Sequence, residues 1–351
     1  MSTPLVKNTL YLTIASTAQK VIAFVYFAYL SSYFGAGETG AYFVALGIIT
    51  TLAVFEDVGL TSVLIREVAK KDFKPAYWLK RVMGIKSITI PLMVLVALFG
   101  FDLIAQVMTW FGSEAEISAS VRQYVQIGAI IIVADTLSLS FFGVLRGLKE
   151  LKYESLGVFV GQLFTAIIGG TLMITGVATI PLMLMALAVG SSWNLLYSLI
   201  ILLKRIGLNA FIPSYQEIPT LIKMAGAFFI GAVFVKLMSY FDSFLLITLD
   251  GKEAVGNYAV AYKFTYAFQF LPLVFVAALY PEMSSKDASG ERLKKITLDA
   301  FWYMMLIGSP IIFGLWAIAP ALIDTLYDLS EFGNSILILQ TLVFVLFFIF
   351  L

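Results

Sequence analysis

The chain has 351 residues, of which 60% are hydrophobic and only 13% are charged, and its net charge is +1. Water-soluble domains have roughly a quarter of their residues in charged types, so this composition excludes an ordinary soluble protein. The chain has no cysteine and no histidine, which excludes disulfides, thiolate chemistry and His-ligated metals, and its charge indicates no nucleic-acid partner.

Ten apolar segments follow one another along the chain, each of a length suited to a spanning helix. Such a helix needs about 20 predominantly apolar residues. The first segment follows MSTPLVKN without a small-x-small cleavage site, so we expect a spanning helix rather than a removed signal peptide. We therefore predict an all-α polytopic membrane protein with spans at 8–34, 41–63, 87–110, 123–144, 156–176, 181–203, 224–249, 256–280, 298–321 and 333–351.

The loops between these spans alternate in basic content. With the N-terminus in the cytoplasm, eighteen of the 23 basic residues fall on the inner side, whereas the opposite side receives only Arg122 and Lys252. Inner loops of membrane proteins carry this excess of lysine and arginine. We therefore expect a multi-pass protein of the cytoplasmic membrane with its N-terminus inside.

The two halves of the chain resemble each other at an offset of 216 residues. Of the 38 positions from 8 to 45, eight are identical at this offset, where an apolar-rich chain gives roughly three by chance. The identities include Lys20 with Lys236, Gly35 with Gly251, and Gly40 with Gly256. Each repeat holds an even number of spans, so the repeats are predicted to be parallel and related by an axis along the membrane normal.

This repeat predicts two six-helix lobes, an N-terminal lobe at 1–210 and a C-terminal lobe at 211–351. The second lobe holds only its first four helices, because the sequence stops inside an apolar run. A second unit as long as the first would bring the chain to about 430 residues. We expect an incomplete second lobe, and a natural ten-span protein is the alternative.

Two of the three lysines inside the predicted spans lie at matched depth near the bilayer midplane. At 1.5 Å per residue, Lys20 lies about 18 Å from the inner end of its helix and about 22 Å from Gly35, too far to snorkel. A charge there costs at least about 2.5–3.5 kcal/mol, so it requires a wet cavity or a partner. We expect Lys20 and Lys236 to face each other across a central cavity and attract an anionic substrate group.

Buried ion pairs are the competing interpretation of the charges within the spans. Asp135 matches the depth of Lys20, and Asp242 lies on the span next to that of Lys263. The pairs Lys20–Asp135 and Lys263–Asp242 would then serve only to fix helix packing, and Lys236 would be left without a partner. Because ionisable residues inside membranes are functional by default, we favour substrate attraction, and Asp135, Asp242 and Lys263 are expected to act in coupling or pairing.

Two arginines close the second and fourth spans at the inner mouth. Arg66 in VLIREVAKK and Arg146 in GVLRGLKELK lie where a phosphate near the lipid headgroups would first be met. The topology rule alone also predicts basic residues there. Nearby, Glu56 and Asp57 are candidate counter-ions for Arg66, candidate coupling-ion ligands, or solvated charges at a helix end.

Three stretches of the first lobe resemble the polysaccharide-biosynthesis flippase family, the Wzx-type transporters of the multidrug/oligosaccharidyl-lipid/polysaccharide exporter superfamily. They are LSSYFGAGETGAYFVAL (30–46), FEDVGLTSVLIREVA (55–69) and FFGVLRGLKELKYES (141–155). The family has a leucine-glycine turn followed by an acid and G-x-Y, then Asp-x-Gly-Leu with a later arginine, then G-x-hydrophobic-R-G. The resemblance covers the first lobe well and the second weakly.

The resemblance implies twelve or fourteen helices in two lobes around a cationic cavity, and no cofactor. It implies a substrate that is a polyprenyl-pyrophosphate-linked glycan, moved to the outer leaflet by alternating access, with a polysaccharide polymerase and other glycan-assembly proteins as candidate partners. Asp57, Gly59, Arg66 and Arg146 match family motif positions. Ser31 and Ser32 depart from it, because many members carry an arginine before the first turn.

Two other functions compete with a flippase. A cation-coupled drug exporter of the same superfamily would require a carboxylate in the first helix, where this chain has Lys20 and no acid. A membrane glycosyltransferase or ligase would require a sizeable outer loop with catalytic acids or histidines, whereas the predicted outer loops, such as 35–40 and 177–180, are short.

Overall fold

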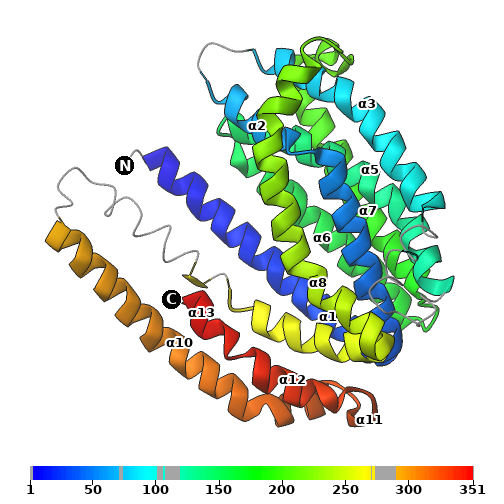
Figure 1. Ribbon diagram of the computed structural model, residues 1–351, viewed down its shortest axis with the longest axis vertical. Coiled ribbons are helices and arrows are strands. Elements are labelled where there is room, and N and C mark those ends of the chain that lie inside the picture. Colours follow the sequence, from blue (N-terminus) through cyan, green and yellow to red (C-terminus); the bar gives the residue numbers. More distant parts are fainter. Residues whose placement is uncertain are drawn as a thin grey trace. The chain divides into compact units, whose positions relative to one another are not determined.

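The computed structural model describes residues 3–70, 74–100, 106, 119–269, 271–272 and 290–350, and the regular elements of these ranges are all helical (Figure 1). The helices are α1 (Thr3–Asp57), α2 (Leu60–Val68), α3 (Pro75–Phe99), α5 (Ala119–Gly147), α6 (Leu151–Ile174), α7 (Ile180–Ile206), the short 3₁₀ helix η1 (Leu208–Phe211), α8 (Ile218–Tyr266), α10 (Gly290–Leu326), α11 (Leu329–Phe332), α12 (Asn334–Leu342) and α13 (Val345–Phe350).

Each of the ten predicted spans overlaps at least one described helix, and α1 and α8 each overlap two predicted spans. Seven of the described helices are long and apolar enough to cross a membrane. The predicted all-α polytopic fold is therefore confirmed. The far ends of the spans predicted at 87–110 and 256–280 lie outside the described residues.

Helix α3 starts earlier in the chain than the span predicted at 87–110. Helix α3 begins at Pro75 rather than at residue 87. Lys80, Arg81 and Lys86 were counted among the basic residues of the inner side. In the structure all three lie in α3, and Arg81 and Lys86 are buried and form ion pairs with carboxylates, which offsets part of the cost of burying their charges.

Two glycines break the long helices at equivalent positions of the repeat. The backbone of α1 leaves the helical conformation at Gly35, where φ is 74°, and that of α8 leaves it at Gly251, where φ is 83°. A β-carbon strains such left-handed angles, so glycine is the residue that permits each break. The breaks are 216 residues apart, so the sequence offset is also an offset in backbone conformation.

The chain divides into two compact units, and the first comprises 3–26 and 41–251. Within this unit α5 packs against α2, α3 and α7, and α6 packs against α7 (Figure 1). A hydrophobic core joins α2, α3, α5 and the start of α8 through residues that include Leu60, Leu64, Leu79, Val82, Phe141, Leu145, Leu221 and Ala225. Burial of these side chains holds α2, α3, α5 and the start of α8 together.

The second unit comprises 27–40 and 252–350, and in it the two repeats cross at close range. A β-carbon on Gly40 would lie 1.8 Å from the carbonyl oxygen of Lys252, and one on Gly256 would lie 1.9 Å from that of Ala36. Ala36 and Lys252 are related by the same 216-residue offset as the two glycines. The contact is therefore self-complementary, as expected around a two-fold axis.

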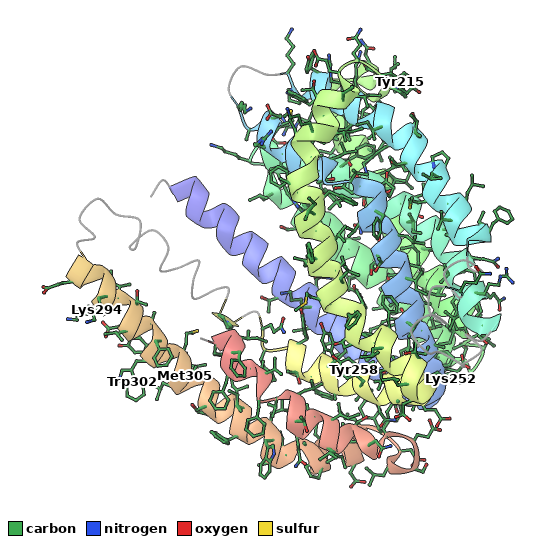
Figure 2. All side chains as sticks on the ribbon, viewed as in Figure 1. Tyr215, Lys252, Tyr258, Lys294, Trp302 and Met305 are labelled. Carbon is green, nitrogen blue, oxygen red and sulfur yellow. The ribbon has the colours of Figure 1, made fainter. Side chains whose placement is uncertain are left out.

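Polar contacts tie the rest of the second unit to this crossing. The Ala36 amide donates to Glu331 Oε2 at 2.9 Å, which satisfies a backbone donor at the restart of the helix. Asn257 Nδ2 donates to the Glu331 carbonyl at 3.0 Å, and Ser335 Oγ donates to Asn257 Oδ1 at 2.8 Å. Lys252 and Tyr258, labelled in Figure 2, lie on the segment that follows Gly251.

The two compact units and the two predicted lobes are divisions of the chain by different criteria. The lobes at 1–210 and 211–351 were inferred from the repeat, whereas the units group residues by contact and divide the chain after Tyr26, Gly40 and Gly251. The lobe boundary near residue 210 stays a prediction.

Candidate functional site: charged residues of the membrane helices

A buried cluster of charges joins α1 to α3 within the first unit. Lys86 Nζ lies 2.7 Å from Glu56 Oε2 and 3.3 Å from Asp57 Oδ1. The side chains of Lys86 and Glu56 are at most 1% exposed, and that of Asp57 is 13% exposed. Thr89 Oγ1 donates to the other Glu56 oxygen at 2.9 Å. Buried charges require such pairing and hydrogen bonding.

The same cluster explains the sequence FEDVGL. Asp57 accepts from the Thr61 hydroxyl at 2.6 Å and from the Thr61 amide at 3.2 Å, so its carboxylate satisfies a backbone donor in the first turn of α2. Gly59 has φ of 76°, and a β-carbon there would lie 2.7 Å from the Ala225 carbonyl oxygen of α8. Asp57 therefore starts α2, and Gly59 allows the turn to pack on α8.

Arg66 pairs with a different carboxylate from those expected. Its Nε donates to Glu67 Oε1 at 3.0 Å, and Lys70 Nζ lies 2.6 Å from Glu67 Oε2. Burial raises the pKa of Glu67, but the hydrogen bonds from Lys70 and Arg66 outweigh it, so this pKa lies below its usual value. Glu56 and Asp57 are therefore not the counter-ions of Arg66. They pair with Lys86, which approaches from α3.

Arg146 is also engaged within its own neighbourhood. Its Nε lies 2.6 Å from Glu154 Oε2, and Nη2 contacts Glu154 Oε1, so the guanidinium donates to both carboxylate oxygens in a bidentate pair. This pair closes the turn between α5 and α6. A phosphate reaching Arg146 would have to compete with Glu154.

The two lysines predicted to lie near the bilayer midplane differ from these paired arginines. Lys20 is exposed on α1, and Lys236 Nζ lies 5.5 Å from the centre of the Tyr240 ring on α8. Among the described residues, neither ammonium forms an ion pair with a carboxylate. The structure thus gives no Lys20–Asp135 pair in the part of the chain that it describes.

Lys263 and Asp242 lie in separate units, so their pairing stays a prediction. Lys263 Nζ lies 4.9 Å from the centre of the Phe27 ring, a cation–π contact inside the second unit. The Asp242 carboxylate accepts from the amide of Ser243 at 2.7 Å.

No group of three or more metal-binding side chains of the kinds His, Cys, Asp and Glu occurs within the described ranges. Of the charges considered above, Lys86, Arg66 and Arg146 form ion pairs, Asp57 also caps α2, and Lys20 and Lys236 form no ion pair with a described carboxylate. Sequence reasoning missed Lys86 as the partner of Glu56 and Asp57, because it counted this lysine among the inner loop cations.

The chain is similar to known proteins both in sequence and in fold. The model of a family described as "Polysaccharide biosynthesis protein" matches residues 5–287. A solved structure titled as the inward-facing conformation of a multidrug resistance MATE family transporter of the MOP superfamily shares the fold, with a TM-score of 0.66 and 18% sequence identity, and the match covers 96% of this chain and 78% of that one. A comparison with curated proteins gave no match.

Proposed function

Because the chain belongs to the polysaccharide biosynthesis protein family, we propose that it is a flippase that moves a polyprenyl-pyrophosphate-linked oligosaccharide from the inner to the outer leaflet of the cytoplasmic membrane. The N-terminus lies in the cytoplasm, and transport proceeds by alternating access between two six-helix lobes. The step is non-covalent, so no catalytic residue is required. The fold shared with a transporter supports this proposal.

The observation that carries the proposal is the pair of membrane lysines without carboxylate partners. An ammonium at the depth of Lys20 cannot face hydrocarbon, and no described carboxylate neutralises it, so it requires water or an anion. Lys236 repeats that depth one repeat later. Two cations facing a cavity would attract a pyrophosphate, and the low dielectric of the membrane interior would strengthen the attraction.

The arginines at the helix ends have a smaller role in this account. Arg66 is 46% exposed and its contact with Glu67 uses Nε, so its terminal nitrogens form a plausible first contact for a phosphate. Arg146 holds Glu154 and is assigned to the α5–α6 turn, with phosphate contact only where Glu154 is displaced.

A drug exporter is the second candidate, since the structural neighbour carries that title. The first span favours the flippase, because it contains Lys20 and no carboxylate that would bind a cation. The two functions make opposite predictions about substrate charge.

Replacing both lysines by alanine is expected to lower transport of the lipid-linked glycan at least about tenfold, which corresponds to about 1.4 kcal/mol of lost attraction. The assay is translocation in proteoliposomes, with Lys20→Ala/Lys236→Ala compared with Lys20→Arg/Lys236→Arg, which keeps both charges. Lys204→Ala, an exposed lysine at the end of α7, is the matched control. Parental transport by the double alanine variant at equal protein content would remove the assigned role.

A further inference from the structure

The segment between α7 and α8 lies along the first turns of α3 and leaves a cavity of about 400 Å³ beside it. Figure 2 labels Tyr215 on this segment. The cavity is lined by Lys74, Ala76, Tyr77, Lys80, Arg81, Ile212, Pro213, Ser214 and Gln216, all of which belong to the first unit. Lys20 and Lys236 are not among its lining residues.

Several contacts hold the wall of this cavity in place. The Ser214 amide donates to the Lys80 carbonyl at 2.9 Å, and Lys80 Nζ donates to Asn209 Oδ1 at 3.0 Å. A β-carbon on Gly84 would lie 2.2 Å from the Ser214 carbonyl oxygen, so only glycine lets the segment approach α3 this closely. A cavity built in this way needs little ordering when a ligand binds.

The charge lining the cavity is cationic. Lys74, Lys80 and Arg81 line it, and Glu217 accepts from Arg81 Nε at 3.2 Å and from the Tyr77 hydroxyl at 2.9 Å. Among the described residues of this network, three positive charges stand against one negative charge. The Arg81 guanidinium also stacks on Tyr77, 3.4 Å from the ring centre, which fixes its plane.

The position of the cavity matches that of lipid phosphates. Helix α3 is long and apolar enough to span a membrane, and residues 74–81 form its first turns, within about 10 Å of one end at 1.5 Å per residue. Ile212 and Tyr215 on the linking segment are 57% and 60% exposed. Exposed apolar and aromatic side chains beside a cationic cavity suit the interface between headgroups and acyl chains.

We propose that this cavity binds the phosphate of an anionic phospholipid headgroup, with Lys74, Lys80 and Arg81 as its ligands. The phosphate replaces Glu217 as a partner of Arg81, and the acyl chains lie along the exposed side of Ile212. Binding fastens the segment that joins the two predicted lobes to α3. The site is independent of the transported substrate.

The test measures binding to the purified chain in a neutral detergent. Dioctanoyl phosphatidylglycerol is added at increasing concentration, and binding is measured by the rise in melting temperature and by equilibrium dialysis. Dioctanoyl phosphatidylcholine and inorganic pyrophosphate are tested separately in the same way. We expect saturable binding of phosphatidylglycerol, at least about tenfold weaker in Lys74→Gln/Lys80→Gln. Glu217→Gln should tighten binding several-fold, because it removes the carboxylate that competes for Arg81.

The control variant is Lys204→Gln/Lys223→Gln, which removes two exposed lysines outside the cavity and should leave the affinity within twofold. Pyrophosphate binding with the same dependence on Lys74 and Lys80, and tighter than that of phosphatidylglycerol, would assign a soluble phosphate as the ligand of this cavity. Absence of saturable binding for both anions, or equal weakening in the control variant, would overturn the site. No outcome depends on transport activity.

Discussion

Alanine in place of Gly256 is expected to disrupt the crossing of the two repeats. The added β-carbon would lie 1.9 Å from the carbonyl oxygen of Ala36, and that atom is backbone, so the helices themselves must separate. Overpacking of this kind costs about 1–3 kcal/mol or more. Gly40→Ala meets the Lys252 carbonyl in the same way and should have a similar effect.

The matched control for this substitution is Gly231→Ala, also in the interior of α8. A β-carbon on Gly231 has no heavy atom of the described structure within 4 Å, so alanine should be neutral or stabilising there by up to about 1 kcal/mol. Thermal unfolding of the solubilised protein measures both changes. Equal melting temperatures for Gly256→Ala and Gly231→Ala would contradict the close crossing.

Lys86→Met is expected to have the second large effect on stability. It leaves the buried Glu56 and the half-buried Asp57 with threonine hydroxyls but no cation. Breaking a buried ion pair by removing one partner costs about 3–5 kcal/mol. Lys70→Met is the control, since Lys70 is half exposed and its removal leaves the buried Glu67 paired with Arg66, so the loss of stability should be smaller.

A double-mutant cycle separates the ion pair from packing effects. Lys86→Met/Glu56→Gln removes one of the stranded charges, so it should lose less stability than the sum of the two single variants. The free energy of unfolding, or the melting temperature as its proxy, is the measurement. Additive losses would show that Lys86 and Glu56 do not depend on each other.

The repeat was the most informative pattern in the sequence. It identified Gly35 and Gly251 as equivalent, and both break a helix with positive φ. The close approach of Gly40 to Gly256 could not be inferred, because an offset relates positions without bringing them together. The helical membrane fold followed from composition and segment length alone, and it is confirmed.

The partners of the charges were harder to predict. Lys86 directly precedes the span predicted at 87–110, so it was counted with the basic residues of the inner side rather than as the partner of Glu56 and Asp57. The partners of Arg66 and Arg146 were closer at hand. Glu67 directly follows Arg66 in the sequence, and Glu154 lies eight residues after Arg146, just beyond the turn that ends α5. Local spacing could therefore have identified both pairs.

The central claim, that a membrane cavity with two cations carries an anionic lipid-linked glycan, is tested most directly by transport in proteoliposomes. The measurement is the rate at which a labelled polyprenyl-pyrophosphate-linked oligosaccharide reaches the opposite leaflet, compared with an analogue that has a neutral linker in place of the pyrophosphate. The account predicts that the chain accelerates movement of the pyrophosphate-linked substrate and leaves the neutral analogue at the rate of protein-free vesicles. Equal acceleration of both lipids, or none of either, would contradict it.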